Sequence, residues 1–183
     1  AGLSYWSFTD CYPLLKELQI DVREQALIMK KAGADLIMLE MMVDIDRMMV
    51  TLNAAKEANL PIWVGMSCKP NISGEMSLLN GEPLSLAIKH LKNHQIDLVN
   101  IMHTDVVYVD DCLDILESEW NGFYGVYAHS GHMRGTEWTF GEVLSPAAYT
   151  DYACNWMGKK ISLLGGCCGI STDHMKFLSK KLF

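Results

Sequence analysis

Two adjacent cysteines have the residue type and the setting for chemistry. The stretch SLLGGCCGIS places Cys167 and Cys168 between glycines at the end of an apolar run. Neighbouring cysteines are poorly placed to form a disulfide with each other. The pair therefore indicates a metal site, a reactive thiol or two small packing residues, and each possibility needs partners elsewhere in the chain.

Other residues that can bind a metal or a substrate also lie where short apolar runs end. They are Glu40, Ser67, Cys68, Asn100, His103, Tyr127, His129 and Ser130. An isolated polar residue of this kind is commonly a hydrogen-bonded structural residue. Five successive runs that end in this way, the cysteine run included, favour a functional rim over packing alone.

The elements that position these residues follow one repeating pattern. Apolar runs of strand length occur at 1–8, 34–41, 61–68, 96–103, 122–129 and 161–168, and helical periodicity occurs at 21–32, 44–58, 84–93, 106–118, 145–158 and 172–181. The runs are apolar on both faces, as parallel strands covered by helices are. Gly33 is expected to close the first helix, and Ser145 with Pro146 to start the fifth. The segment 69–83, rich in Gly, Pro and Asn, is expected to be a substrate cover or a plain connection.

This βα repeat predicts a single α/β domain over residues 1–183. An open doubly wound sheet and a (β/α)₈ barrel both fit the count of units, and in either fold the chemistry gathers at the carboxyl ends of the strands. A closed barrel needs two more strands than the six expected here.

Composition narrows the function classes. The 183 residues are 50% hydrophobic and 20% charged, with a net charge of -7. An acidic chain without a basic cluster argues against nucleic-acid and anionic-membrane partners, and no apolar stretch approaches the roughly 20 residues that span a bilayer. The six cysteines follow no secreted disulfide framework. We therefore expect a cytoplasmic protein that binds small molecules. The protein itself can form a homo-oligomer.

The ending LLGGCCGISTDHMKFL resembles the signature of the zinc-dependent homocysteine S-methyltransferases, which include the betaine-homocysteine enzymes and the homocysteine domain of cobalamin-dependent methionine synthase. Further resemblances follow in order along the chain, in KKAGADLIMLE, PIWVGMSCK, DLVN, GVYAHSG, Trp138, Tyr152 and Trp156. The resemblance spans essentially the whole chain. It implies a (β/α)₈ TIM-type barrel, of which this chain holds strands 3 to 8 and lacks the amino-terminal part.

The resemblance also implies an activity, which is zinc-dependent methyl transfer from a methyl donor to the thiol of homocysteine or a close thiol, giving methionine. Cys167 and Cys168 match two of the three zinc ligands of the family. The third is a cysteine where this chain has Ile101, which cannot bind a metal. His103 is the favoured replacement, because alternation along the strand places it on the same face as residue 101. It would take the position of the cysteine if the strand end shifts by about one residue pair. Cys68, Met102 or no third ligand are the alternatives.

Further roles come from the same resemblance. Glu40 matches the glutamate that receives the substrate amino group, and Glu40 and Asn100 are the expected catalytic residues. Ser67, Tyr127 and Ser130 are expected with Glu40 in substrate binding. His129 replaces an asparagine of the family, as a changed substrate contact, a partner of the metal site or a tolerated variation.

Two other function classes stay open at this point. Ile101, together with Met41 in place of a threonine, fits a homologue with an altered or lost zinc site that acts as a pseudoenzyme or a ligand-binding protein. A metal-free thiol or redox enzyme would instead use Cys167 or Cys168 as its nucleophile.

Overall fold

One parallel sheet of six strands forms the centre of the protein. The computed structural model describes residues 1–7, 9, 11–134, 137–140 and 143–182. Within them the strands lie side by side in chain order, which is β1 (Gly2–Leu3), β2 (Ile37–Met42), β3 (Ile62–Met66), β6 (Leu98–Asp105), β7 (Tyr124–His129) and β10 (Leu163–Gly166). A doubly wound sheet reverses its strand order partway, whereas a barrel wall does not. The order is therefore that of a barrel.

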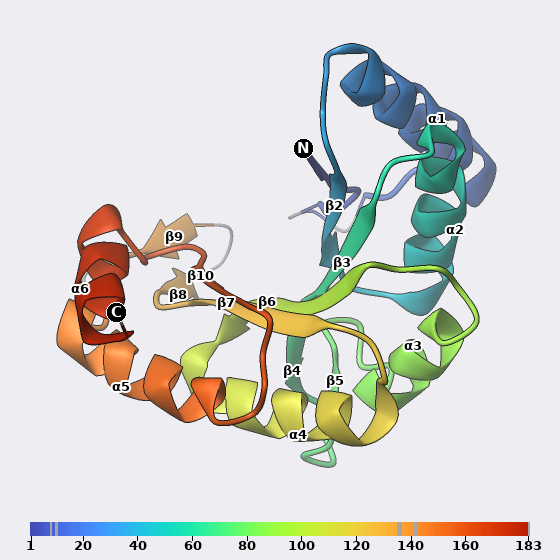
Figure 1. Ribbon diagram of the computed structural model, residues 1–183. Coiled ribbons are helices and arrows are strands. Elements are labelled where there is room, and N and C mark those ends of the chain that lie inside the picture. Colours follow the sequence, from blue (N-terminus) through green and yellow to red (C-terminus); the bar gives the residue numbers. More distant parts are fainter. Residues whose placement is uncertain (8, 10, 135–136, 141–142, 183) are drawn as a thin grey trace.

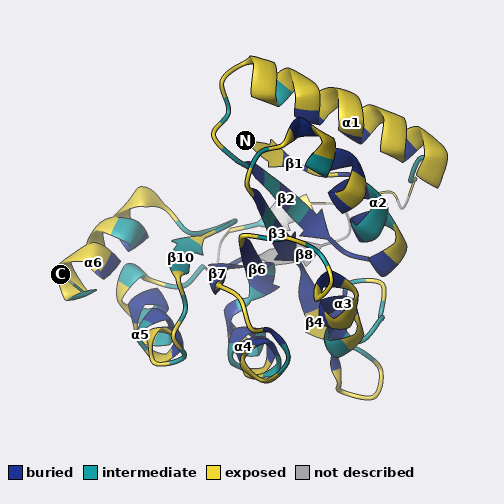
Figure 2. Ribbon diagram, turned by 45° about the vertical axis from the view of Figure 1, so that its right-hand side comes forward, coloured by how far each residue is buried: buried dark blue, intermediate teal, exposed yellow. Residues whose placement is uncertain are grey.

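Helices cover the outer side of this curved sheet (Figure 1). They are α1 (Leu15–Lys31), α2 (Ile45–Ala55), α3 (Leu84–Leu91), α4 (Val109–Glu119), α5 (Pro146–Met157) and α6 (Thr172–Leu182), with short 3-10 turns η1 (Lys56–Ala58) and η2 (Val106–Tyr108). Figure 2 shows that most of the strands β3, β6 and β7 and the inward sides of α3 and α4 are buried, while β10 is only partly buried and α1 exposes a long outer face. Among the described residues, no helix combines the length and apolar character needed to cross a membrane.

Most expected elements are present, with three differences. Helix α1 begins at Leu15 rather than at residue 21, because the Glu17 carboxylate accepts a hydrogen bond from the N–H of Leu14 and supports an earlier first turn. The first strand is shorter than expected. The segment 69–83 is not a plain loop, because β4 (Cys68–Pro70) and β5 (Met76–Leu78) pair as an antiparallel hairpin.

Two expected helix boundaries are confirmed. Gly33 follows α1 with a φ of 91°, in the left-handed region that glycine adopts without a steric cost. Ser145 caps α5, since its hydroxyl accepts a hydrogen bond from the N–H of Ala148, and Pro146 follows at the first helical position. A second hairpin, β8 (His132–Arg134) with β9 (Glu137–Thr139), lies between β7 and α5.

Side chains that meet across the sheet define its concave inner face. The Tyr127 hydroxyl on β7 donates to the Met38 sulfur on β2 at 3.0 Å and to the Met102 sulfur on β6 at 3.1 Å. Strands β2 and β7 are not neighbours in the sheet, so these side chains meet inside the barrel wall. Because side chains alternate along a strand, Ile101 beside Met102 points to the outer, helix-covered face, where it is fully buried.

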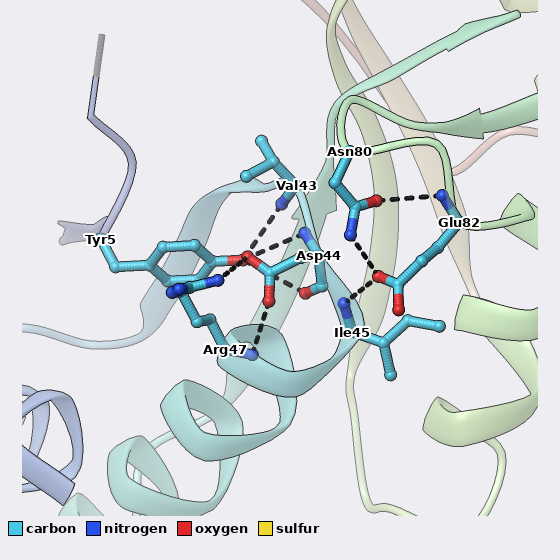
Figure 3. Close-up of polar contacts among 7 residues, drawn as sticks. All are labelled: Tyr5, Val43, Asp44, Ile45, Arg47, Asn80 and Glu82. Carbon is cyan, nitrogen blue, oxygen red and sulfur yellow. Dashed lines mark hydrogen bonds and ion pairs between the residues drawn. The ribbon is translucent and has the colours of Figure 1, made fainter. Parts of the chain in front are cut away.

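A polar network fixes the chain at the carboxyl end of β2 (Figure 3). The Tyr5 hydroxyl accepts from the N–H groups of Val43 and Asp44, and the Asp44 carboxylate caps α2 by accepting from the N–H three residues later. The Glu82 carboxylate, beyond the β4–β5 hairpin, accepts from the N–H of Ile45 at 2.8 Å. The network thus holds the first segment and the hairpin against the rim next to Glu40.

Candidate metal and substrate site

The two cysteines follow β10 in a turn that is tied to β7. The N–H of Cys167 donates to the carbonyl of Ala128 at 2.8 Å, and the carbonyl of Cys168 accepts from the N–H of Ser130 at 2.9 Å. Gly169 has a φ of +80°, and a Cβ there would lie 1.7 Å from the Ser130 oxygen, so only glycine fits. The turn brings the two sulfur atoms to 3.8 Å from each other.

His103 reaches this pair through a bulge in β6. The pairing of β6 with β7 shifts between Met102 and Asp105, and His103 has a φ of 45°. Regular alternation would place His103 on the outer face with Ile101. The bulge turns it inward instead, and its Nδ1 lies 3.3 Å from the Cys167 sulfur and 3.7 Å from the Cys168 sulfur. An extra residue, rather than a shift by a residue pair, therefore places this side chain.

The donor set fits a zinc ion. With zinc bonds of about 2.3 Å to sulfur and about 2.0 Å to nitrogen, tetrahedral geometry separates two sulfur ligands by about 3.8 Å and a sulfur from a nitrogen by about 3.6 Å. The observed separations are 3.8 Å between the sulfur atoms and 3.3 and 3.7 Å to the histidine nitrogen. In the described ranges, His103, Cys167 and Cys168 are the group of three with this spacing. Two thiolates and an imidazole leave a fourth position open.

The competing ligand candidates do not join the group. Cys68 is buried outside it, where its N–H donates to the Thr104 hydroxyl. Its hydrogen bond with the Cys112 thiol, together with burial, raises the pKa of Cys68 well above the usual range. The Met102 sulfur instead accepts from the Tyr127 hydroxyl and from the N–H of Met41.

Burial sets the charge state of His103 and Cys167. It lowers the pKa of His103 to about 4, with a further contribution from His129, whose ring centroid is 4.8 Å away. The imidazole is therefore neutral at physiological pH, as a metal ligand must be. Burial and the neighbouring Cys168 raise the pKa of Cys167 to about 12. Without a cation beside it, Cys167 is a protonated thiol and a poor nucleophile.

Glu40 and Tyr127 share the inner face with the cysteines. The Glu40 carboxylate lies against Gly2, where an added Cβ would come within 2.6 Å of the carboxylate oxygen. Burial raises the pKa of Glu40. Burial also raises the pKa of Tyr127, helped by the charges of Glu40 and Cys167. These three side chains are thus close enough to influence one another.

The remaining expected site residues are buried around the same rim. The Ser67 hydroxyl donates to the Met41 sulfur at 3.2 Å, and the Ser130 hydroxyl accepts from the N–H of Leu144 at 2.6 Å. Asn100 is fully buried, and neither its amide nitrogen nor its amide oxygen has a hydrogen-bond partner among the described residues. Burying an amide without hydrogen-bond partners costs free energy of folding. The unpaired Asn100 amide is therefore a position where a ligand or another segment can supply a partner.

Sequence patterns alone gave no sign of several side chains near the site. The sequence did not indicate that the Met38 thioether accepts a hydrogen bond from Tyr127, and Met102, which it offered as an alternative zinc ligand, accepts one as well. Trp6 lies 6.2 Å from His103 between ring centroids, and its short strand-like context gave no hint of this position. The side chain of Trp138 lies outside the described part of the chain.

Comparisons with known proteins agree with this geometry. The sequence profile of the homocysteine S-methyltransferase family matches residues 10–182. Homocysteine S-methyltransferase 1 of Zea mays is 24% identical over 166 residues, which cover 87% of this chain and 50% of that protein. Homocysteine S-methyltransferase 2 of Arabidopsis thaliana is 22% identical over 174 residues, covering 92% of this chain and 51% of that protein.

A solved structure of a homocysteine methyltransferase has the same fold as this chain. The metallated form of the homocysteine methyltransferase MmuM from Escherichia coli superposes with a TM-score of 0.74 at 19% identity, covering 94% of this chain and 54% of that one. The (β/α)₈ fold class is confirmed. The chain spans about half the length of the relatives that it matches. Because the family profile matches nearly all of its residues, the chain belongs to the homocysteine S-methyltransferase family.

Proposed function

We propose that this chain supplies the zinc site and part of the substrate pocket for methyl transfer to the thiol of homocysteine, or of a close thiol, giving methionine. The spacing of the three donor atoms of His103, Cys167 and Cys168 carries the proposal, because it suits one tetrahedral ion. The names of the plant and bacterial relatives support homocysteine as the acceptor.

The chain's own residues would divide the work between metal and substrate. Cys167, Cys168 and His103 would hold the ion and leave its fourth position for the substrate sulfur. A zinc ion there would lower the pKa of the substrate thiol, so that it is a thiolate at neutral pH. The partly buried thiols and the neutral His103 support this assignment, since each offers a lone pair inside the barrel.

The substrate's amino group would pair with Glu40. A partly buried carboxylate forms a strong charge-assisted hydrogen bond with an ammonium group. Tyr127, Ser67 and Ser130 would shape the pocket, and the unpaired amide of Asn100 offers a donor and an acceptor to the reacting groups.

Methyl transfer itself is then a direct displacement. The substrate sulfur forms a bond to the methyl carbon while the bond from that carbon to the donor breaks, and the donor keeps the electron pair. A sulfonium or quaternary ammonium donor leaves as a neutral molecule, so no general acid is required. We place this reaction in the cytoplasm, which suits six cysteines that are all free.

Metal analysis of the purified protein tests the proposal. We expect about one zinc per chain, the stoichiometry of a Cys₂His site with one open position. Cys167→Ser removes one of three ligands and should abolish binding, and His103→Ala should weaken it strongly. Inductively coupled plasma mass spectrometry and competition with a chromogenic chelator measure both effects.

Cys154→Ser is the matched control, because Cys154 lies in α5 outside the donor group and the variant should keep wild-type zinc affinity. Zinc-free wild-type protein with no affinity for added zinc would refute the proposal and favour a pseudoenzyme. A titrating thiol of low pKa in metal-free protein would favour the thiol-enzyme alternative.

A further inference from the structure

Hydrogen bonds and short backbone segments form a closed ring next to the cysteine turn, and the buried His174 is part of it. His174 belongs to the first turns of α6 and is 5% exposed. Its Nε2 lies 2.8 Å from the carbonyl oxygen of Leu144, and its Nδ1 lies 3.1 Å from the backbone nitrogen of Ser171. The imidazole thus joins the start of α6 to the segment that precedes α5.

The partners of His174 fix its tautomer. The Leu144 carbonyl can only accept a hydrogen bond, so Nε2 must carry the hydrogen. The backbone N–H of Ser171 can only donate, so Nδ1 must be the acceptor. Both ring nitrogens are therefore used by the backbone, and neither is available to a metal or a substrate.

The ring continues from Leu144 to the cysteines. The N–H of Leu144 donates to the Ser130 hydroxyl at 2.6 Å, and the N–H of Ser130 donates to the Cys168 carbonyl at 2.9 Å. From Cys168 the backbone passes Gly169, which packs against the Ser130 carbonyl, and returns to Ser171. Cys168, a candidate metal ligand, is thus connected to His174 in two directions. One connection runs through Ser130 and Leu144, and the other runs along the backbone to Ser171.

We propose that His174 is a positioning residue for the cysteine pair, acting through Ser171 on one side and through Leu144 and Ser130 on the other. The inference rests on the proposed zinc site. Loss of the imidazole would leave a backbone N–H and a carbonyl without their partners and would release the turn that sets the direction of the Cys168 sulfur. The zinc affinity would fall although no ligand has changed.

His174→Phe tests this role, because phenylalanine keeps an aromatic ring against Tyr149, 6.0 Å away between centroids, but forms neither hydrogen bond. We expect zinc affinity to fall about tenfold or more, the usual effect of losing a group that orients a ligand. The absorption bands of the cobalt-substituted protein should also change, since they report ligand geometry. Chelator competition and visible spectroscopy measure the two effects.

Tyr124→Phe is the control for a purely structural loss. It removes a hydrogen bond from a buried side chain to the Lys159 carbonyl, away from the cysteines, and should keep zinc affinity and the cobalt spectrum. If His174→Phe does not fold, the smaller His174→Leu, which also forms neither hydrogen bond, gives the same comparison.

The outcomes separate the two proposals. Wild-type zinc affinity in the His174 variants, with stability lowered as in Tyr124→Phe, would overturn the positioning role alone. Wild-type protein that binds no zinc would overturn the proposed function, and the positioning role with it.

Discussion

The direction of one side chain in β6 decides whether this protein has a third metal ligand. His103 and Met41 both have left-handed φ values, 45° and 56°, and each lies at a register shift of its strand. A residue other than glycine in such a conformation costs about 1 to 3 kcal/mol and persists only where its surroundings hold it. Here one strained residue, His103, is itself a donor, and the other, Met41, directly follows Glu40. The strain in β6 turns His103 inward and leaves Ile101 in the outer core.

This account predicts that a cysteine at position 101 cannot replace His103. In the double variant Ile101→Cys with His103→Ala, we expect zinc affinity to stay as low as in His103→Ala alone, because residue 101 points toward the helices. Ile101→Cys alone should lower the free energy of unfolding by about 1 to 3 kcal/mol through lost packing. Chelator competition and urea unfolding measure the two effects, and recovery of zinc binding in the double variant would contradict the bulge.

At the scale of elements, the glycine turn after β10 makes the cysteine pair possible. Gly169 and Gly33 both have positive φ values, +80° and +91°. An added Cβ at Gly169 would collide with the backbone oxygen of Ser130, whereas at Gly33 it would meet nothing within 4 Å. The two glycines thus share the conformational requirement and differ in the space around them.

The pair gives a matched test. Gly33→Ala should lower the free energy of unfolding by about 1 to 2 kcal/mol, because alanine is disfavoured in the left-handed conformation. Zinc binding should stay unchanged. Gly169→Ala carries the same conformational cost plus a clash that must move Ser130 or the turn, so its unfolding free energy should fall further and zinc affinity should be lost. Equal stability losses with intact zinc binding in both variants would show that the turn does not depend on this close approach.

The sequence predicts the regular strands and several helix boundaries, but not the local departures from regular structure. Apolar runs marked all six strands, and Gly33 and Ser145 marked helix boundaries through their local conformations. The early start of α1 and the β4–β5 hairpin depend on contacts that no periodicity reports. The bulge at His103 was also beyond prediction, because alternation along a strand assumes that no residue is extra.

At the scale of the whole molecule, the donor group joins distant parts of the chain. His103 lies on β6 and Cys167 follows β10. The two residues are 64 positions apart in the sequence, and β7 lies between their strands in the sheet. Buried side chains from Leu3 to Leu178 form one hydrophobic cluster, so we propose that the chain unfolds as a single domain. An ion held at this site would therefore cross-link the sheet near its carboxyl-terminal edge.

Zinc should accordingly stabilise the native state against urea. An ion that binds only the folded protein adds about 2.7 kcal/mol when its free concentration is a hundred times the dissociation constant. We expect one cooperative transition by circular dichroism and by tryptophan fluorescence, with a midpoint that rises when zinc replaces a chelator. In Cys167→Ser the midpoint should not respond to zinc, which separates site binding from general metal effects. An unchanged wild-type midpoint would mean that the three donors do not act together. Transitions that differ between the two probes would show a populated partly folded state and would contradict unfolding as a single domain.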